Sequence, residues 1–365
     1  MHILILGGGV FLGVATLTAA LARGHRVTVF NRGRARSAWP QGVEAITGDR
    51  GTDLHQLEAR QWDAVIDTCG YTPAEVRSSC DALRGCGRYL FVSSISVYAT
   101  THQVPVRETD PLARFEAIAA DDRDMQHYGP QKAACEAEVS RVFGERALLV
   151  RPGLIVGPGD RSGRFSYWPW RVMGNGVMGS GEIGSGEIGN GETGSDGTAG
   201  SEMLVPDVPA HEPLQFIDVR DLGEWLVLLL ERGASGAINA TGPVGDGSTG
   251  ACNWPTLLAT CAQQAHARGI APASAVPVSE AFLIDQKVAP WSELPLWLPS
   301  TDPEYRGFNR VDLTRAAAAG LRTRALRETV AAVMDEGVPE AADARHKGKL
   351  TRERERSLID AVRLA

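Results

Sequence analysis

Long apolar stretches are missing from this sequence of 365 residues. No apolar run approaches the length of about 20 residues that a helix needs to cross a bilayer. The N-terminus also lacks a basic segment followed by an apolar segment and a cleavage site, so no signal peptide is expected. We therefore expect a cytoplasmic protein with no membrane partner.

Metal-ligand and disulfide patterns are missing as well. The cysteines contain no CxxC pair and the eight histidines no HExxH. We expect no metal site, and we expect most cysteines to be small buried hydrophobes. The cysteines are Cys69, Cys80, Cys86, Cys135, Cys252 and Cys261.

Excess positive charge is absent too. The chain has 37 lysines and arginines against 44 acidic residues, a formal net charge of −7. This balance argues against a nucleic-acid partner bound through a broad basic face. The length exceeds one typical core and predicts one large domain or two joined domains.

The first thirteen residues, MHILILGGGVFLG, carry the strongest local signal. A short apolar run meets three glycines and then a run of helix formers, which predicts a buried strand, a turn and a helix N-terminus. Backbone N–H groups and the positive helix end could hold a pyrophosphate there. Gly7 and Gly13 fit the dinucleotide fingerprint, but Val10 stands where the GxxGxxG spacing requires glycine. A glycine-rich turn in another α/β protein is the alternative.

Strands and helices then alternate along the chain. Strands are predicted at 25–30, 43–47, 64–67, 89–92 and 147–151, and a helix at 73–83 with Thr72 as its N-cap. This order predicts an α/β fold with a doubly wound parallel (Rossmann) sheet, with ligands at the carboxyl ends of the strands.

The end of the second strand indicates the cofactor. No acidic residue is present to accept hydrogen bonds from an adenosine ribose, whereas Arg32, Arg34 and Arg36 follow Asn31. Arginines at this position suit a 2′-phosphate, which favours NADP(H) over NAD(H). A solvated basic loop is the alternative. After the third strand, Asp49 could accept from the adenine amino group.

Tyr128 and Lys132 lie one helical turn apart at the start of a predicted helix. A nearby ammonium is expected to lower the phenol pKa from about 10, so that Tyr128 could act as a general acid or base. A serine hydroxyl at a strand end, such as that of Ser94, could bind a reacting carbonyl oxygen. A surface Tyr–Lys pair is the structural alternative.

Six motifs together resemble the extended or atypical short-chain dehydrogenases/reductases of the NAD-dependent epimerase/dehydratase family. They are GGGVFLG at 7–13, Gly48-Asp49, VSSISVY at 92–98, YGPQK at 128–132, RPGLIVGP at 151–158 and FIDVRD at 216–221. The resemblance runs from Met1 to about Arg232 and more loosely to Glu336. Similar glycine turns occur in atypical members, including a chloroplast branch associated with RNA.

The resemblance implies roles for individual residues. Ser94, Tyr128 and Lys132 match the catalytic positions, with Lys132 holding the nicotinamide ribose. Ser96 is expected to orient the substrate. Arginines and aromatic residues also mix at 160–171, where Arg164, Tyr167 and Trp168 could line a substrate pocket for a ring or an anionic group. Packing of the aromatics, with the arginines at the rim, is the alternative. The expected cofactor-binding residues are Gly7, Gly9, Val10, Phe11, Leu12, Gly13, Asn31, Arg32, Arg34, Asp49, Arg50, Thr68, Cys69, Gly70, Tyr128, Lys132, Pro152 and Gly153.

Three regions are expected along the chain. Residues 1–158 form the dinucleotide-binding domain, and 159–336 a substrate-binding region interleaved with the last sheet strands. Within the latter, 179–201 repeats GSGEI-like units, which predicts a flexible acidic insertion. Residues 337–365 are a charged helical tail, whose mixed signs suggest a solvated face.

Hydride transfer between NADP(H) and a carbonyl or alcohol of a small organic molecule is the leading hypothesis. A sugar-nucleotide epimerase that oxidises its substrate transiently with NAD is an alternative, because it uses the same three residues. A non-catalytic nucleotide- or RNA-binding protein is the second alternative. A homodimer is left open, because helices of this fold often form a dimer interface.

Overall fold

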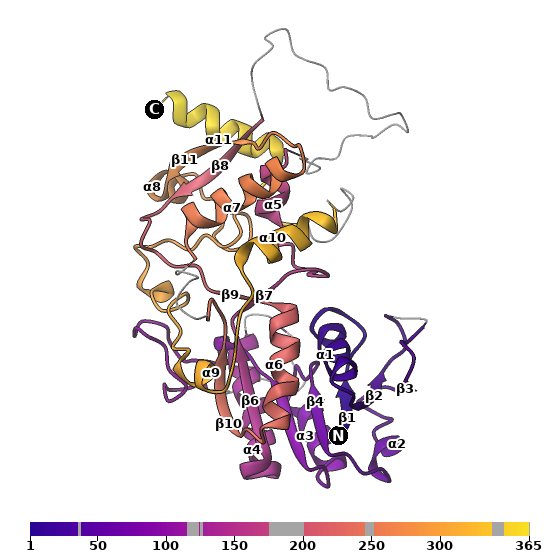
Figure 1. The fold of residues 1–365 in the computed structure, drawn as a ribbon. Coiled ribbons are helices and arrows are strands. Elements are labelled where there is room, and N and C mark those ends of the chain that lie inside the picture. The colour runs from indigo at the N-terminus through magenta and orange to yellow at the C-terminus, as the bar shows by residue number, and fades with distance from the viewer. Residues whose placement is uncertain are drawn as a thin grey trace. The chain divides into compact units, whose positions relative to one another are not determined.

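The computed structural model (Figure 1) describes residues 1–35, 38–114, 124, 127–174, 201–244, 252–337 and 347–364. It contains a seven-stranded parallel sheet, called the central sheet below. The strand order is β10-β6-β5-β4-β1-β2-β3. The prediction of a doubly wound α/β fold is confirmed. The strands are β1 (His2–Leu6), β2 (Arg26–Asn31), β3 (Val43–Thr47), β4 (Ala64–Asp67), β5 (Arg88–Val92), β6 (Ala147–Pro152) and β10 (Gly236–Ala240).

Helices cover both faces of this sheet because the strand side chains alternate between two apolar cores. Ile3 and Ile5 of β1 belong to one core, and Leu4 and Leu6 to the other. The first core is covered by α1 (Phe11–Ala22), α6 (Val219–Glu231) and α9 (Thr314–Ala318). The second is covered by α2 (His55–Glu58), α3 (Pro73–Ala82) and α4 (Tyr128–Phe143).

Local signals set the starts of two of these helices. Thr72 caps α3 as predicted: its Oγ1 accepts from the N–H of Glu75, and Pro73 occupies the first turn. Asp218 caps α6 and accepts from the N–H of Arg220 at 2.8 Å. The strand before α6 therefore ends at Asp218. This strand, β9 (Phe216–Asp218), pairs with β7 (Leu154–Val156) outside the central sheet.

The chain divides into two compact units. The first consists of residues 1–155, 215–250 and 303–324, and the second of 156–214, 251–302 and 325–365. The second holds α5 (Tyr167–Val172), α7 (Trp254–Ala267), α8 (Glu280–Asp285), α10 (Leu326–Asp335) and α11 (Arg352–Leu364), together with the parallel pair β8 (Glu202–Asp207) and β11 (Ser274–Ser279). The predicted insertion at 179–201 lies outside the described residues except for Ser201.

The charged C-terminal helix α11 has an exposed face and buries its other face within the second unit. Glu355 is 2% exposed, pairs with Arg171 at 2.8 Å, and accepts from the N–H of Leu204. None of the described helices is both long and apolar enough to span a bilayer.

Candidate active site

The glycine turn after β1 leads into α1 at the carboxyl edge of the sheet. Gly7 and Gly8 have φ angles of +108° and +78°, which favour glycine. The N–H of Gly7 donates to the carbonyl of Phe30 at the end of β2. A Cβ on Gly13 would lie 2.7 Å from the Cα of Gly8, so glycine at position 13 lets the helix start pack against the turn.

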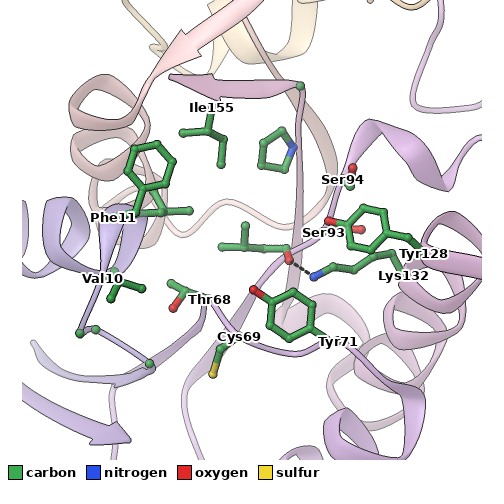
Figure 2. A pocket seen from close by; sticks show the side chains of 18 residues that line it. Val10, Phe11, Thr68, Cys69, Tyr71, Ser93, Ser94, Tyr128, Lys132 and Ile155 are labelled. Carbon is green, nitrogen blue, oxygen red and sulfur yellow. Dashed lines mark hydrogen bonds between the residues drawn. The ribbon is translucent and has the colours of Figure 1, made fainter. Parts of the chain in front are cut away.

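Val10 fits this turn without backbone strain. Its φ of −142° and ψ of 154° are extended values that any residue adopts. The positive φ of 40° falls instead on Phe11. Figure 2 shows the Val10 side chain at the cavity beside the turn, and it is 40% exposed. Valine in place of the glycine of the GxxGxxG spacing therefore puts a branched side chain in front of the N-terminus of α1.

Asn31 joins the end of β2 to the turn. Its Nδ2 donates to the carbonyl of Gly7 at 3.0 Å, and its Oδ1 accepts from the N–H of Gly33 at 2.8 Å. Arg32 and Arg34 follow on the surface and are exposed. Arg36 lies outside the described residues.

Arg50 is held in a buried polar network and does not line the cavity. Its guanidinium donates to both carboxylate oxygens of Asp67, at 3.1 and 2.7 Å, and to Ser79 at 2.8 Å. Asp67 also accepts from the hydroxyl of Tyr89. Burial alone would raise the pKa of Asp67, but the adjacent guanidinium and these hydrogen bonds hold it below its usual value. Arg50 thus ties the loop after β3 to the end of β4 and to α3.

Ser94, Tyr128 and Lys132 meet at one wall of the cavity, as the motifs predict (Figure 2). The Ser94 hydroxyl lines the cavity together with Tyr128 and accepts from the N–H of Ser96 at 3.1 Å. The ammonium of Lys132 donates to the carbonyls of Gly70 and Val92 at 2.8 and 2.9 Å. The loop after β4 and the last residue of the neighbouring strand β5 therefore fix the lysine.

Burial dominates the ionisation of this group. It raises the pKa of Tyr128 above 10, and the nearby Ser94 hydroxyl offsets only part of that shift. The direction is opposite to the lowering expected from the Tyr–Lys spacing, since the Lys132 Nζ lies 6.0 Å from the centre of the tyrosine ring. Burial likewise lowers the pKa of Lys132.

The cavity has a volume of about 310 Å³ and lies entirely in the first unit. Thirteen of the predicted site residues line it: Gly7, Gly9, Val10, Phe11, Leu12, Gly13, Thr68, Cys69, Ser94, Tyr128, Lys132, Pro152 and Gly153. Sequence reasoning missed five further lining residues: Gly8, Tyr71, Val92, Ser93 and Ile155. Each of the five lies within or beside a predicted segment, so proximity in sequence was the available signal.

Several predicted residues lie elsewhere. Ser96 is exposed beside Ser94, and Asp49 is exposed and accepts from the N–H of Gly51. Neither these two nor Asn31, Arg32, Arg34, Arg50 and Gly70 line the cavity. Tyr167 and Trp168 are buried in the second unit, where the Trp168 indole donates to the carbonyl of Pro295.

Arg164 also lies in the second unit. Its guanidinium lies over the ring of Trp291 at 5.5 Å, and its Nε is buried with no hydrogen-bond partner in the part of the chain that the structure describes. An aromatic face and an unpaired guanidinium N–H suit a planar or anionic group.

Curated relatives match part of the chain, whereas no family model matches. A 2-alkyl-3-oxoalkanoate reductase of Stenotrophomonas maltophilia is 32% identical over 185 residues, 44% of this chain and 53% of the relative. A chloroplast stem-loop binding protein of 41 kDa from Arabidopsis thaliana is 30% identical over 146 residues, 35% of this chain and 39% of the relative. The chain thus spans about half the length, or less, of these relatives.

Solved structures match 92% of the chain. The enzyme WbmH of Bordetella bronchiseptica in complex with NAD⁺ is 17% identical, with a TM-score of 0.60 over 97% of that chain. A Bacillus cereus UDP-glucuronic acid 4-epimerase with NAD is 14% identical, with a TM-score of 0.59 over 98%. The human epimerase family protein SDR39U1 with NADPH is 16% identical, with a TM-score of 0.55 over 99%. The chain has the fold of these proteins and resembles, as its motifs predict, the extended short-chain dehydrogenases/reductases of the NAD-dependent epimerase/dehydratase family.

Proposed function

We propose that this chain is an NADP(H)-dependent oxidoreductase that interconverts a carbonyl and an alcohol on a small organic substrate. One observation carries the proposal. Ser94, Tyr128 and Lys132 face a cavity whose other lining residues include the whole glycine turn from Gly7 to Gly13. A site for a proton donor therefore adjoins a site suited to a dinucleotide.

The residues present fit a nicotinamide dinucleotide. The turn from Gly7 to Gly9 has no side chains, and the N–H groups at the start of α1 have no acidic residue in the first turn to occupy them. The Lys132 ammonium has three N–H donors, of which two bond to carbonyls. The third has no acceptor among the described residues and is free for a ribose hydroxyl.

The protein's part in the reaction is orientation and proton transfer. When bound, the dinucleotide supplies or accepts the hydride. In the reducing direction, Ser94 donates a hydrogen bond to the carbonyl oxygen, and the phenol of Tyr128 gives its proton to that oxygen as the carbon gains the hydride. The raised pKa of Tyr128 keeps this phenol protonated at neutral pH.

The cofactor preference rests on the end of β2. Arg32 and Arg34 are exposed there, and no acidic residue occupies the strand end. Within the described residues neither arginine has an ion-pair or hydrogen-bond partner. Both are free to bind a 2′-phosphate, which supports NADP(H).

The relatives point to a substrate class. The 2-alkyl-3-oxoalkanoate reductases are named for a substrate with a ketone and a carboxylate. We propose a similar keto acid here, with Ser94 and Ser96 on the carbonyl side of the substrate.

Replacement of Tyr128 by phenylalanine tests the proposal. We expect Tyr128→Phe to lower kcat for NADPH-dependent reduction of 3-oxo acids by about 10²- to 10⁴-fold, the usual contribution of a general acid. The dissociation constant of NADPH should stay within about twofold, because the ring remains. A Tyr128→Phe variant with the same kcat as the wild type would contradict the role assigned to Tyr128.

The two alternatives give other results. An epimerase would interconvert a sugar nucleotide without net consumption of NADPH. If the protein is non-catalytic, the wild type and Tyr128→Phe would behave alike, and neither would turn over a substrate. The relative that binds a chloroplast stem-loop makes an RNA-binding assay a useful third arm.

A further inference from the structure

Ser93 carries a buried hydroxyl with unused hydrogen-bonding capacity. The residue is 4% exposed, and its Oγ has no hydrogen-bond partner among the described residues. Its backbone N–H donates to the carbonyl of Val150 at 2.7 Å, so the main chain is fixed at the end of β5. Ser93 also lines the cavity. Buried hydroxyls without a partner are uncommon, because water is lost without a replacement bond.

The adjacent serine behaves differently. The Ser94 hydroxyl donates to the hydroxyl of Ser96 and accepts from the N–H of Ser96, both at 3.1 Å. The two serines at this strand end therefore have separate environments. Ser94 belongs to the proton-donor group, whereas Ser93 has bonding capacity left for a bound molecule.

We infer that Ser93 is a cofactor-binding residue, whose hydroxyl hydrogen-bonds a polar group on the nicotinamide riboside half of the dinucleotide. Ser93 directly follows Val92, whose carbonyl accepts from Lys132. Figure 2 shows the Ser93 side chain beside Tyr128 and Lys132, while Val10 and the glycine turn lie apart from it. The adenosine half would lie by the turn and β2, so Ser93 is placed for the other half. This inference rests on the proposed function.

Two ligands distinguish binding of the nicotinamide half of the cofactor from binding of its adenosine half. NADPH carries both halves, whereas adenosine 2′,5′-bisphosphate carries only the adenosine half. We expect Ser93→Ala to weaken NADPH binding about fivefold, the loss of one hydrogen bond, and to leave bisphosphate binding unchanged. Both constants can be measured by titration of the substrate-free protein, without turnover. If the wild type prefers NADH, then NADH and AMP replace this pair.

Folding controls separate binding from a structural role. Because the Ser93 hydroxyl has no partner in the free protein, Ser93→Ala should unfold at the same or a higher urea concentration than the wild type. Ser78→Ala, on the exposed face of α3, is the matched serine control and should change neither constant.

Three outcomes overturn the inference. Equal NADPH binding by the wild type and Ser93→Ala would do so and leave the proposed function intact. Equal weakening of both ligands would show a general distortion. Wild-type protein that binds no nicotinamide nucleotide would overturn the proposed function as well.

Discussion

Lys132 owes its position to backbone carbonyls, not to an acidic partner. It is 3% exposed, lies 4.6 Å from the centre of the Phe91 ring, and donates to Gly70 and Val92. Its ammonium is thus held at the ends of β4 and β5 before any ligand binds. Preorganised charge of this kind costs no rearrangement during reaction.

The pH profile should follow from the raised pKa of Tyr128. Reduction needs the protonated phenol, so kcat for reduction should be level around neutral pH and fall only as pH rises beyond about 10. Oxidation of the alcohol needs the phenolate, so its rate should increase with pH over that range. Steady-state rates across pH 6–11 check both directions. Loss of reduction through an apparent pKa near 7 would contradict this ordering.

The sequence predicts the catalytic residues better than their electrostatics. The i and i+4 spacing of Tyr128 and Lys132 fixes a shared helix face, and the strand end fixes Ser94. The electrostatics depend on tertiary structure. The burial of Tyr128 and Lys132, and the partners that Arg50 finds, depend on which strands become neighbours in the sheet. Arg50 and Asp67 are 17 positions apart, and β3 and β4 are not adjacent in the sheet. No local pattern contains that pairing.

At the level of elements, the start of α1 gives a prediction for Val10. Val10→Gly removes the side chain in front of the helix N-terminus, so the pyrophosphate can approach the N–H groups more closely. We expect the dissociation constant of NADPH to fall a few-fold. The free energy of unfolding should decrease by about 0.5–1 kcal/mol, because glycine increases the entropy of the unfolded chain. Calorimetric titration and urea unfolding measure the two effects, and weaker binding would contradict the steric argument.

Arg50 links three elements, and its removal should be costly. Arg50→Met leaves the fully buried Asp67 without its cation, so the free energy of unfolding should fall by about 3–5 kcal/mol near neutral pH. Arg26→Met is the matched control. Arg26 pairs with Glu44 at 3.7 Å on the surface, where about 1 kcal/mol or less is expected.

The same pair predicts an acid dependence. The folded-state pKa of Asp67 is lowered from 3.8, so its stabilising effect is present above that value and is lost as pH falls through the folded pKa. The difference between the wild type and Arg50→Met should therefore shrink in acid. A difference that is constant from pH 7 to 3 would assign the loss to packing alone.

Element prediction succeeded for most strands of the central sheet. The strands predicted at 25–30, 43–47, 64–67, 89–92 and 147–151 lie within one residue of the observed bounds of β2 to β6. Most of them are short apolar runs, although β3 has no buried residue. The pair β8–β11 was missed because each strand is mixed in polarity and contains a proline, Pro206 or Pro277. Proline is tolerated there because this sheet has only two strands, each with a free edge.

For the molecule as a whole, the order of segments explains why domain limits were hard to predict. The first unit is assembled from three separate stretches of chain, and β10 returns to the central sheet beside β6 after a long excursion. Apolar periodicity identifies such a strand but not the unit that it joins. In the second unit, α11 is held by the buried pair of Glu355 and Arg171, which lie 184 positions apart.

Binding of the two nicotinamide nucleotides, followed by fluorescence on the purified protein, tests the proposed function most directly. We predict that NADPH binds in the micromolar range and more tightly than NADH, and that Arg32→Ala reduces the preference about tenfold by removing one charged contact to the 2′-phosphate. Tighter binding of NADH would contradict the cofactor assignment and favour an epimerase. Failure of both nucleotides to bind at micromolar concentrations would contradict the oxidoreductase proposal itself.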